Sequence, residues 1–347
     1  MTYGTDTDFK NLIEKHQLAE AINHNLALHC KRYSHHGSRK LASPIAMDDM
    51  ALTETLKLLF NINHWYPEYQ ESFSKAIPSI IKTIRKIKIT NPPLQQPVQA
   101  LLSALTNLDL QDKKNSGFGY SALFPKLESK ANVEHFINVL DAAVAFYPER
   151  ELDTNVAPVL NLLRMTYKIA PDNVKKFMEW LLLPTDEERS KAIGKSDTLS
   201  SRLLRLSTCP VAPTFRQSIQ ALMFELSGED SNKFVRNVGY GFASGFFMNK
   251  GMAVPQSALE AFSTTGADGK PGPQINPITG QRKDMEPEDD EPPMTTEEKM
   301  REAEKMFVLI ERLRRTGVVD VKNPVEEMVQ SGRFQELPDD ETDEDEK

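Results

Sequence analysis

Apolar residues recur with helical spacing through most of this chain, which predicts an all-α protein. From residue 8 to about residue 262 they fall at intervals of three and four, while the alternation typical of strands is scarce. Short breaks rich in Pro, Asn and Asp separate these stretches. Pairs and triplets of helices follow at intervals of roughly 40–50 residues, which is the spacing of an armadillo- or HEAT-like superhelical solenoid.

Four helices illustrate the pattern. Their apolar stripes are Leu52, Leu56, Leu59, Phe60 with Asn63; Val98, Leu101, Leu102 and Leu105; Phe136, Val139, Leu140 and Ala143; and Val156, Val159, Leu160, Leu163 and Tyr167. The breaks contain proline, which lacks a backbone donor and restricts the residue before it, at Pro67, Pro92, Pro148, Pro171, Pro184 and Pro210. The first two helices end alike, in LKLLFNI and LLSALTNL, so that Asn61 and Asn107 are 46 residues apart. A bundle of unrelated helices is the alternative.

Composition divides the chain into four parts. We expect the helical solenoid to occupy residues 1–263, with a mobile loop at 112–119. Residues 264–294 are rich in Gly, Pro and acid and are predicted to form a flexible linker, because such a segment buries too little apolar area to offset its ordering entropy. The capping box Thr295-x-x-Glu298 then predicts an amphipathic helix to about residue 316, within a C-terminal helical region over 295–334. An acidic, disordered tail is expected at 335–347.

Bulk properties exclude several classes of protein. The formal net charge of −8 argues against a general nucleic-acid binder. Two cysteines, Cys30 and Cys209, are too few for a disulfide scaffold and favour a reducing compartment. No apolar run approaches the roughly 18 residues needed to span a bilayer, and the amino terminus lacks the features of a signal peptide. The sequence therefore predicts a soluble, cytoplasmic protein.

No motif for covalent chemistry or metal binding is evident. Gly239-Tyr240-Gly241 lacks the preceding strand and the GK[ST] of a phosphate loop, so we interpret it as a break between two short helices. In that interpretation Ser231 caps the first helix, Gly239 ends it in the left-handed conformation, and Gly251 closes the second. His24, His29, Cys30, His35 and His36 are close in sequence but lack the spacing of metal ligands.

Candidate binding residues are basic or carry an amide. Arg forks pair with carboxylates, and we expect equivalent positions on stacked helices to share a concave face that would suit an acidic peptide or a terminal carboxylate. The basic candidates are Lys195, Arg202, Arg205, Arg216, Lys233 and Arg236, together with Tyr240. Asn61 and Asn107 could hold a partner's backbone, since an amide offers a donor beside an acceptor. Ordinary solvated positions, or capping of their own helices, are the alternatives.

The predicted C-terminal helix carries an apolar stripe that includes Met306, Phe307 and Ile310. A helix with such a stripe must pack either on its own solenoid or in a partner's groove. Full burial of Phe307 and Ile310 would contribute about 3–6 kcal/mol before ordering costs.

Four segments resemble the synembryn family, and its fungal branch is the nearest match. They are GKSDTLSSRLLRLST (194–208), KFVRNVGYGFASGFFMNKG (233–251), INPITG (275–280) and TTEEKMREAEKMF (295–307). The resemblance implies a guanine-nucleotide exchange factor and folding chaperone for G-protein α subunits (Gα). It implies an armadillo-like fold whose groove takes the Gα C-terminal helix, while the tethered helix contacts the nucleotide-binding domain. It also implies that the chain itself holds no nucleotide, cofactor or metal.

The resemblance has limits that leave a second function open. Family members usually have further repeats ahead of LKLLFN, which this chain lacks, so an armadillo-type adaptor or assembly chaperone without exchange activity is the alternative. The family partner is Gα, GDP-bound or nucleotide-free, and any peripheral membrane association is expected to occur through Gα. The acidic Ser/Thr phosphosites that animal members carry before the INPITG stretch are replaced by TTGADGKPGPQ, and Thr342 is the comparable acidic site here.

Overall fold

The computed structural model describes residues 9–36, 45–111, 121–253, 262–265 and 271–286, together with 295, 301–302, 305, 307–309 and 312. The chain divides into two compact units, Met1–Glu286 and Pro287–Lys347. The prediction of an all-α protein is confirmed, since the described residues are mostly helical and include two short strands. The described residues do not include several segments for which the sequence makes predictions: the loop at 112–119, the end of the C-terminal helical region at 323–334, and the acidic tail at 335–347 with Thr342.

The helices of the first unit have the following bounds: α1 Phe9–His16, α2 Leu18–His36, α3 Ile45–Trp65, α4 Gln70–Phe73, α5 Ile77–Lys86, α6 Val98–Thr106, α7 Ala131–Phe146, α8 Leu152–Asn155, α9 Ala157–Ile169, α10 Asp172–Leu182, α11 Leu199–Leu206, α12 Pro213–Leu226 and α13 Ser231–Lys250. Short 3₁₀ turns lie at Pro67–Tyr69, Ser74–Ala76, Glu149–Glu151, Glu188–Ser190 and Lys283–Met285. Pro is the first or second residue of several of these helices, as at Pro158 and Pro213. At these positions an N–H would have no acceptor within the helix, so its absence removes no helical hydrogen bond.

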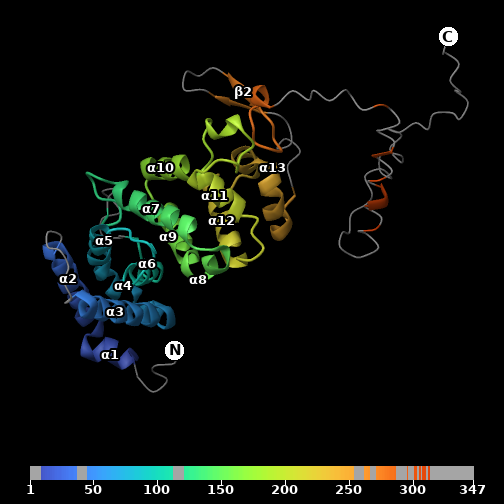
Figure 1. Cartoon of the computed structure of the whole chain (residues 1–347). Coiled ribbons are helices and arrows are strands. Elements are labelled where there is room, and N and C mark those ends of the chain that lie inside the picture. Colours follow the sequence, from blue (N-terminus) through green and yellow to red (C-terminus); the bar gives the residue numbers. More distant parts are fainter. Residues whose placement is uncertain are drawn as a thin grey trace, which may run out of the picture. The chain divides into compact units, whose positions relative to one another are not determined.

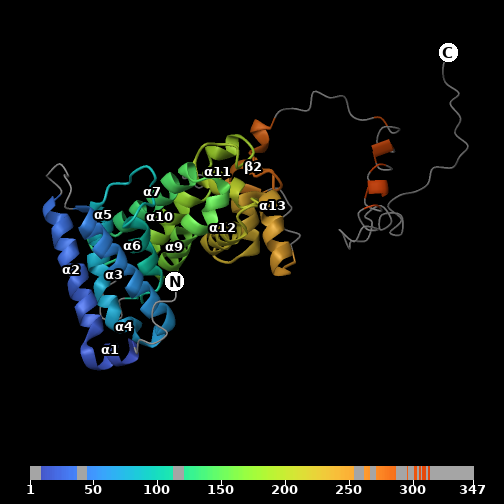
Figure 2. The ribbon, with the colours of Figure 1, turned by 60° about the horizontal axis from the view of Figure 1, so that its bottom comes forward.

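The helices form two rows that pack against each other. In the first row, α3 packs on α6, α6 on α9, α9 on α12 and α12 on α13. In the second row, α2 packs on α5, α5 on α7 and α7 on α11, and α2, α5, α7 and α11 each also contact a helix of the first row. The colours of Figures 1 and 2 follow these rows from blue at α2 and α3 to orange at α13.

The core runs continuously between the rows. The stripes predicted from helical spacing are buried: Leu56, Leu59, Leu101, Leu140 and Leu163 are fully enclosed. Phenylalanines join α12 to α13, where Phe224 and Phe234 lie edge to face with their ring centroids 5.5 Å apart and Phe246 lies 4.9 Å from Phe224. Edge-to-face pairs of this kind add to the stabilisation from area burial. The core therefore fixes both halves of α13.

Helix α13 is kinked at the Gly-Tyr-Gly motif. Gly239 has φ 72° and ψ 153°, so its positive φ is as predicted, but its ψ differs from that of the left-handed helical region. The helix is capped by the Asp230 carboxylate, which accepts from the amides of Asn232 and Lys233; the prediction of Ser231 as the cap is wrong by one residue, because the carboxylate reaches both orphan donors. Gly251 closes the helix, as predicted, and it adopts the left-handed conformation.

The sequence predicts a flexible linker from residue 264, but much of this segment is folded. Strands β1 (Phe262–Thr265) and β2 (Pro271–Ile275) pair antiparallel, and a turn over 276–281 follows. Ile275 is fully buried, and Asn276 Oδ1 accepts from the Ile278 amide at 2.9 Å. The composition of this segment does not predict that it is folded, because its backbone groups form hydrogen bonds with residues much earlier in the chain.

Candidate functional site

Two of the segments that carry the family resemblance, 233–251 and 275–280, meet at the kink of α13. In a straight helix the amides of Tyr240 and Gly241 would donate to the carbonyls of Arg236 and Asn237. Instead they donate to Pro277 O at 2.8 Å and to Ile278 O at 3.2 Å, both in the 276–281 turn. The turn therefore supplies the acceptors that the kink removes.

Arg189 satisfies the carbonyls that the kink leaves free. Its Nη2 donates to Arg236 O at 3.0 Å and Asn237 O at 3.1 Å, and its Nη1 donates to Gly280 O at 3.0 Å. The residue is only 4% exposed, and burial lowers the pKa of its guanidinium from the ordinary value. A planar group with five donors suits this arrangement of three carbonyls. Sequence analysis missed Arg189, because it lies in the run TDEERSK, which resembles a solvated charged surface.

Close approach at this site depends on glycine. A Cβ on Gly239 would lie 3.1 Å from Ile278 O, and a Cβ on Gly280, whose φ is 67°, would lie 2.7 Å from the Ile193 side chain. The Ile193 amide in turn donates to Thr279 O at 3.1 Å. The glycines thus allow the turn to lie directly on the kink.

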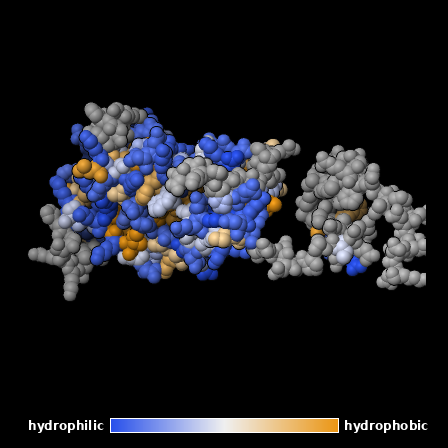
Figure 3. All heavy atoms as spheres, turned by 90° about the horizontal axis from the view of Figure 1, so that it is seen from above, coloured by the Kyte–Doolittle hydropathy of each residue, from blue (hydrophilic) through white to orange (hydrophobic). Residues whose placement is uncertain are grey.

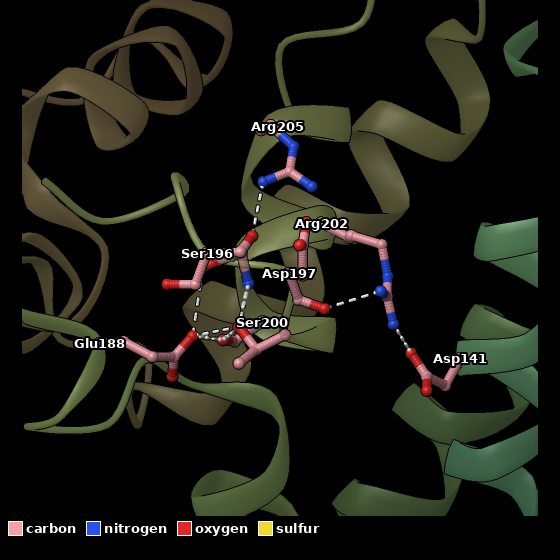
Figure 4. Close-up of polar contacts among 9 residues, drawn as sticks. Asp141, Glu188, Ser196, Asp197, Ser200, Arg202 and Arg205 are labelled. Carbon is pink, nitrogen blue, oxygen red and sulfur yellow. Dashed lines mark hydrogen bonds and ion pairs between the residues drawn. The ribbon is translucent and has the colours of Figure 1, made fainter. Parts of the chain in front are cut away.

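Glu188 organises the adjoining loop. Its carboxylate accepts from Ser200 Oγ at 2.5 Å, from Ser201 Oγ at 3.1 Å, from the Thr185 amide at 2.8 Å and from the Thr198 hydroxyl (Figure 4). Burial by itself raises the pKa of the Glu188 carboxyl, but these hydrogen bonds outweigh it and hold the pKa below the ordinary value. The serines of the motif LSSRLL therefore bind an internal carboxylate.

The predicted basic residues that lie on helices are divided between the two rows. Arg202 and Arg205 lie on α11 in the second row. Arg202 pairs with Asp141 of α7 and donates to Asp197 O at 2.7 Å, while Arg205 donates to Gly194 O at 2.5 Å and Ser196 O at 2.8 Å (Figure 4). These contacts brace the 194–198 loop.

The other basic candidates are distributed over the loop and the first row. Arg216 on α12 is half-buried and donates from Nη1 to Cys209 O at 3.4 Å. Lys233 and Arg236 are exposed on α13, and Lys195 is exposed in the loop before α11. The Tyr240 side chain is half-buried and packs against the core.

An asparagine occurs on each of three successive helices of the first row. Asn61 is exposed on α3, and Asn107 at the end of α6 donates from Nδ2 to Phe60 O at 3.2 Å. Asn161 on α9 is exposed, and its Oδ1 accepts from Ser218 of α12 at 3.5 Å. Sequence analysis missed Asn161. The signal was a repeated pattern, an apolar residue two places before the Asn and another directly after it, in LFNI, LTNL and VLNL.

The second unit is described at a few positions only. Residues 301–302, 305, 307–309 and 312 are helical, within the helix that the capping box predicts. Phe307 is 39% exposed, with Val308 and Leu309 beside it more exposed still. Met306 and Ile310 lie outside the described residues.

No group of three or more His, Cys, Asp or Glu that could hold a metal occurs among the described residues. His29 is buried, and desolvation, together with Arg32, lowers its pKa. Within the described ranges no helix has the length and apolar character needed to cross a bilayer.

Known proteins identify the family. A family model described as guanine nucleotide exchange factor synembryn matches residues 1–333. A synembryn-like chaperone of Schizosaccharomyces pombe is 28% identical over 300 residues, which cover 82% of this chain and 56% of that protein. The chaperone Ric-8A of Xenopus tropicalis is 24% identical over 332 residues, covering 87% and 58%, so the chain spans a little over half the length of these two relatives. The resemblance drawn from the four motifs is confirmed, and the chain belongs to the synembryn family.

Proposed function

We propose that this protein is a guanine-nucleotide exchange factor and folding chaperone for heterotrimeric G-protein α subunits, acting without covalent chemistry or a cofactor in the cytoplasm. Membership of the synembryn family supports the proposal, as do the names of the relatives, which are chaperones. We further propose that the two rows of helices form an armadillo- or HEAT-like superhelix. Rows in which each helix contacts its counterpart in the next repeat are the expected architecture of such a solenoid.

The observation that carries the proposed binding mode is the set of asparagines along the first row. Asn61, Asn107 and Asn161 lie on helices that pack successively on one another. Amides spaced along such a surface can hold an extended or helical partner segment through its backbone, since each offers a donor and an acceptor. We propose that the C-terminal helix of Gα lies along this row.

Basic residues would meet the carboxylate at the end of that helix. Lys233 and Arg236 are exposed on α13, where the first row ends, and are the strongest candidates. Lys195, Arg202, Arg205, Arg216 and Tyr240 stay in the proposed site, although the guanidinium groups of Arg202 and Arg205 already make internal contacts. Arg202 and Arg205 would then act mainly by holding the 194–198 loop in place.

The C-terminal helix would act as a second contact. We propose that 264–294 and 295–334 function as connector and helical arm, and that Met306, Phe307 and Ile310 bind the nucleotide-binding domain of Gα. Phe307 is exposed, as a residue awaiting a partner surface would be. Two contacts that both favour the open form of Gα would supply the preference of about 5.5 kcal/mol needed to convert a mostly closed population to a mostly open one.

Nucleotide release from purified Gα tests the proposal. The native chain should accelerate GDP release and bind nucleotide-free Gα more tightly than GDP-bound Gα. Replacing Asn61, Asn107 and Asn161 together by Ala should weaken binding to a peptide of the Gα C-terminus at least about tenfold, at a typical cost of about 1 kcal/mol for each hydrogen bond lost. Asn173→Ala is the matched control, because Asn173 is exposed on α10, outside the first row.

The same experiment separates the second candidate function. An armadillo-type adaptor or assembly chaperone would bind Gα without accelerating GDP release. Deletion of 295–347 should slow release severalfold while leaving peptide binding intact. If the deletion left the release rate unchanged, the helical arm would have no role in exchange; if the triple variant bound the peptide normally, the first row would not be the groove.

A further inference from the structure

A basic face begins at the C-terminal end of α5, a helix of the second row. The stretch 82–90, KTIRKIKIT, contains four basic residues and no acidic ones, in a chain whose net charge is −8. Lys82, Lys86 and Lys88 are all exposed at the end of α5 and in the segment after it. Basic residues at a helix C-terminus suit the helix dipole, but that effect explains only the last turn.

Contacts extend this face from α5 to α10. Arg85 Nη2 pairs with Glu128 Oε2 at 2.9 Å, which places the 126–130 segment beside the end of α5. Ser129 accepts from Asn173 of α10 at 3.1 Å. Lys130 Nζ lies 5.0 Å from the centroid of the Phe177 ring on α10. We define the α5–α10 face as the residues that make these contacts and their neighbours in the sequence: Lys82, Arg85, Lys86, Lys88, Lys126, Leu127, Lys130, Phe177 and Trp180.

Large apolar side chains project from among these cations. Leu127, between Lys126 and Lys130 in the segment, is 96% exposed, and Ile89 after Lys88 is 38% exposed. Trp180 is 65% exposed, and its ring lies 6.3 Å from that of Phe177, at an interplanar angle of 27°. Seen from above in Figure 3, separate apolar side chains likewise stand out from a mostly hydrophilic surface. One exposed Leu needs no explanation, but apolar groups within one continuous basic patch do.

We propose that the α5–α10 face binds the surface of an anionic lipid bilayer, with Leu127 and Trp180 entering the headgroup region. Lysines attract acidic lipids without a shaped pocket, and Trp favours the boundary between headgroups and acyl chains. Four acidic side chains lie near the face: Glu128 pairs with Arg85, Glu179 accepts from the Tyr167 hydroxyl, Glu134 is exposed in the first turn of α7, and Asp172 lies at the start of α10. The basic side chains outnumber them. An acidic protein segment would match the charge but not the projecting Leu127 and Trp180.

Direct contact with a membrane goes beyond the proposed action on Gα, which requires no contact between this chain and a bilayer. It would hold the chain at a membrane surface through residues other than the three asparagines of the first row. The two functions rest on different residues and can fail independently.

Vesicle cosedimentation of the full chain tests the proposal. The protein should bind phosphatidylcholine vesicles containing 30% phosphatidylserine, should not bind phosphatidylcholine alone, and should dissociate as salt rises from about 0.05 to 0.3 M. Reversal of Lys82, Lys86, Lys126 and Lys130 to Glu should weaken binding at least about a hundredfold. Leu127→Asp should weaken it about tenfold. The matched control reverses Lys10, Lys15, Lys191 and Lys250, which are also exposed but lie elsewhere, and it should bind nearly as well as the native chain.

A spectroscopic measurement separates insertion from mere attraction. In a Trp65→Phe background, Trp180 is the one remaining tryptophan, and its emission should shift to the blue on phosphatidylserine vesicles. Absence of binding, equal binding to neutral vesicles, equal loss in the control variant, or an unshifted emission would each overturn the proposal. Binding to soluble polyglutamate that the Lys82/86/126/130 variant loses, with vesicle binding unchanged, would assign the face to an acidic protein segment instead.

Discussion

The kink of α13 depends on a side chain that lies 47 residues earlier, and its removal gives the sharpest test of the structure. Arg189→Met keeps the length and apolar stem of the side chain but leaves the carbonyls of Arg236, Asn237 and Gly280 without the donors they have now. A hydrogen bond from a charged donor contributes about 1.5–3 kcal/mol, and desolvation of the buried guanidinium offsets part of the total. We therefore expect a loss of about 3–5 kcal/mol.

Most of the lost stabilisation should appear as local opening at the α13 kink, because the rest of the core does not involve Arg189. Hydrogen exchange at the amides of Tyr240, Gly241 and Ile193, which bond to the 276–281 turn, should accelerate by about 10²–10³-fold. Amides within α6 and α9 should exchange at their usual rates. Arg189→Lys should be intermediate, since an ammonium cannot reproduce the planar fork.

Arg150→Met is the matched control. Its side chain is 78% exposed and its contact with Glu151, at 3.8 Å, is a weak surface pair. It should leave exchange throughout the chain unchanged. Unaltered protection at Tyr240 and Gly241 in Arg189→Met would refute the argument that the guanidinium replaces missing helix bonds.

Three further substitutions test other contacts by urea unfolding. The pKa of the Glu188 carboxyl is lowered in the folded protein, so its ionised form stabilises the fold at neutral pH, and this contribution is lost as pH falls through the folded pKa. Glu188→Gln should therefore have a lower free energy of unfolding than the native chain at pH 7, and the difference should narrow below about pH 4. A difference that stays constant from about pH 3 to 7 would contradict the assignment. Gly239→Ala should lower the free energy of unfolding by about 2–3 kcal/mol. Gly228→Ala should lower it less, because Gly228 also has a positive φ but its Cβ would meet nothing within 4 Å. Equal losses would show that the approach of Ile278 O to Gly239 is unimportant. Arg164→Met breaks the paired bonds from α9 to the buried Glu225 of α12 and should cost about 2 kcal/mol. A double-mutant cycle with Glu225→Gln that finds no coupling would exclude the pair as a link between these two helices of the first row.

Local patterns predicted the helices well. The stripes at Leu56, Leu101, Leu140 and Leu163 are buried because a period near 3.6 residues leaves one face for the core, and that relation needs no knowledge of neighbouring helices. Prolines marked the breaks because their effect on the backbone is local. The positive φ of Gly239 and the end of the helix at Gly251 were predicted for the same reason.

The candidate site was predicted less well, because its contacts join distant parts of the chain. Arg202 and Arg205 are residues of the type expected on a partner-binding surface. Whether a guanidinium faces a partner or a loop carbonyl, however, depends on which row its helix joins. The apolar residues around Asn161 repeat the pattern found around Asn61 and Asn107. It was not predicted because the interval from Asn107 to Asn161 is longer than that from Asn61 to Asn107.

By itself the sequence determined that this chain is helical, where most helices begin and end, and to which family it belongs, because those properties follow from local periodicity and from motifs. Only the tertiary structure decided which residues are free to bind. It buried Arg189 and Glu188, folded 271–286 onto α13, and gathered the asparagines of three helices in one row. The physical reason is that a buried polar group must find its partner wherever the fold supplies one, and in this protein the partners of the α13 kink lie some 40 residues to either side of it.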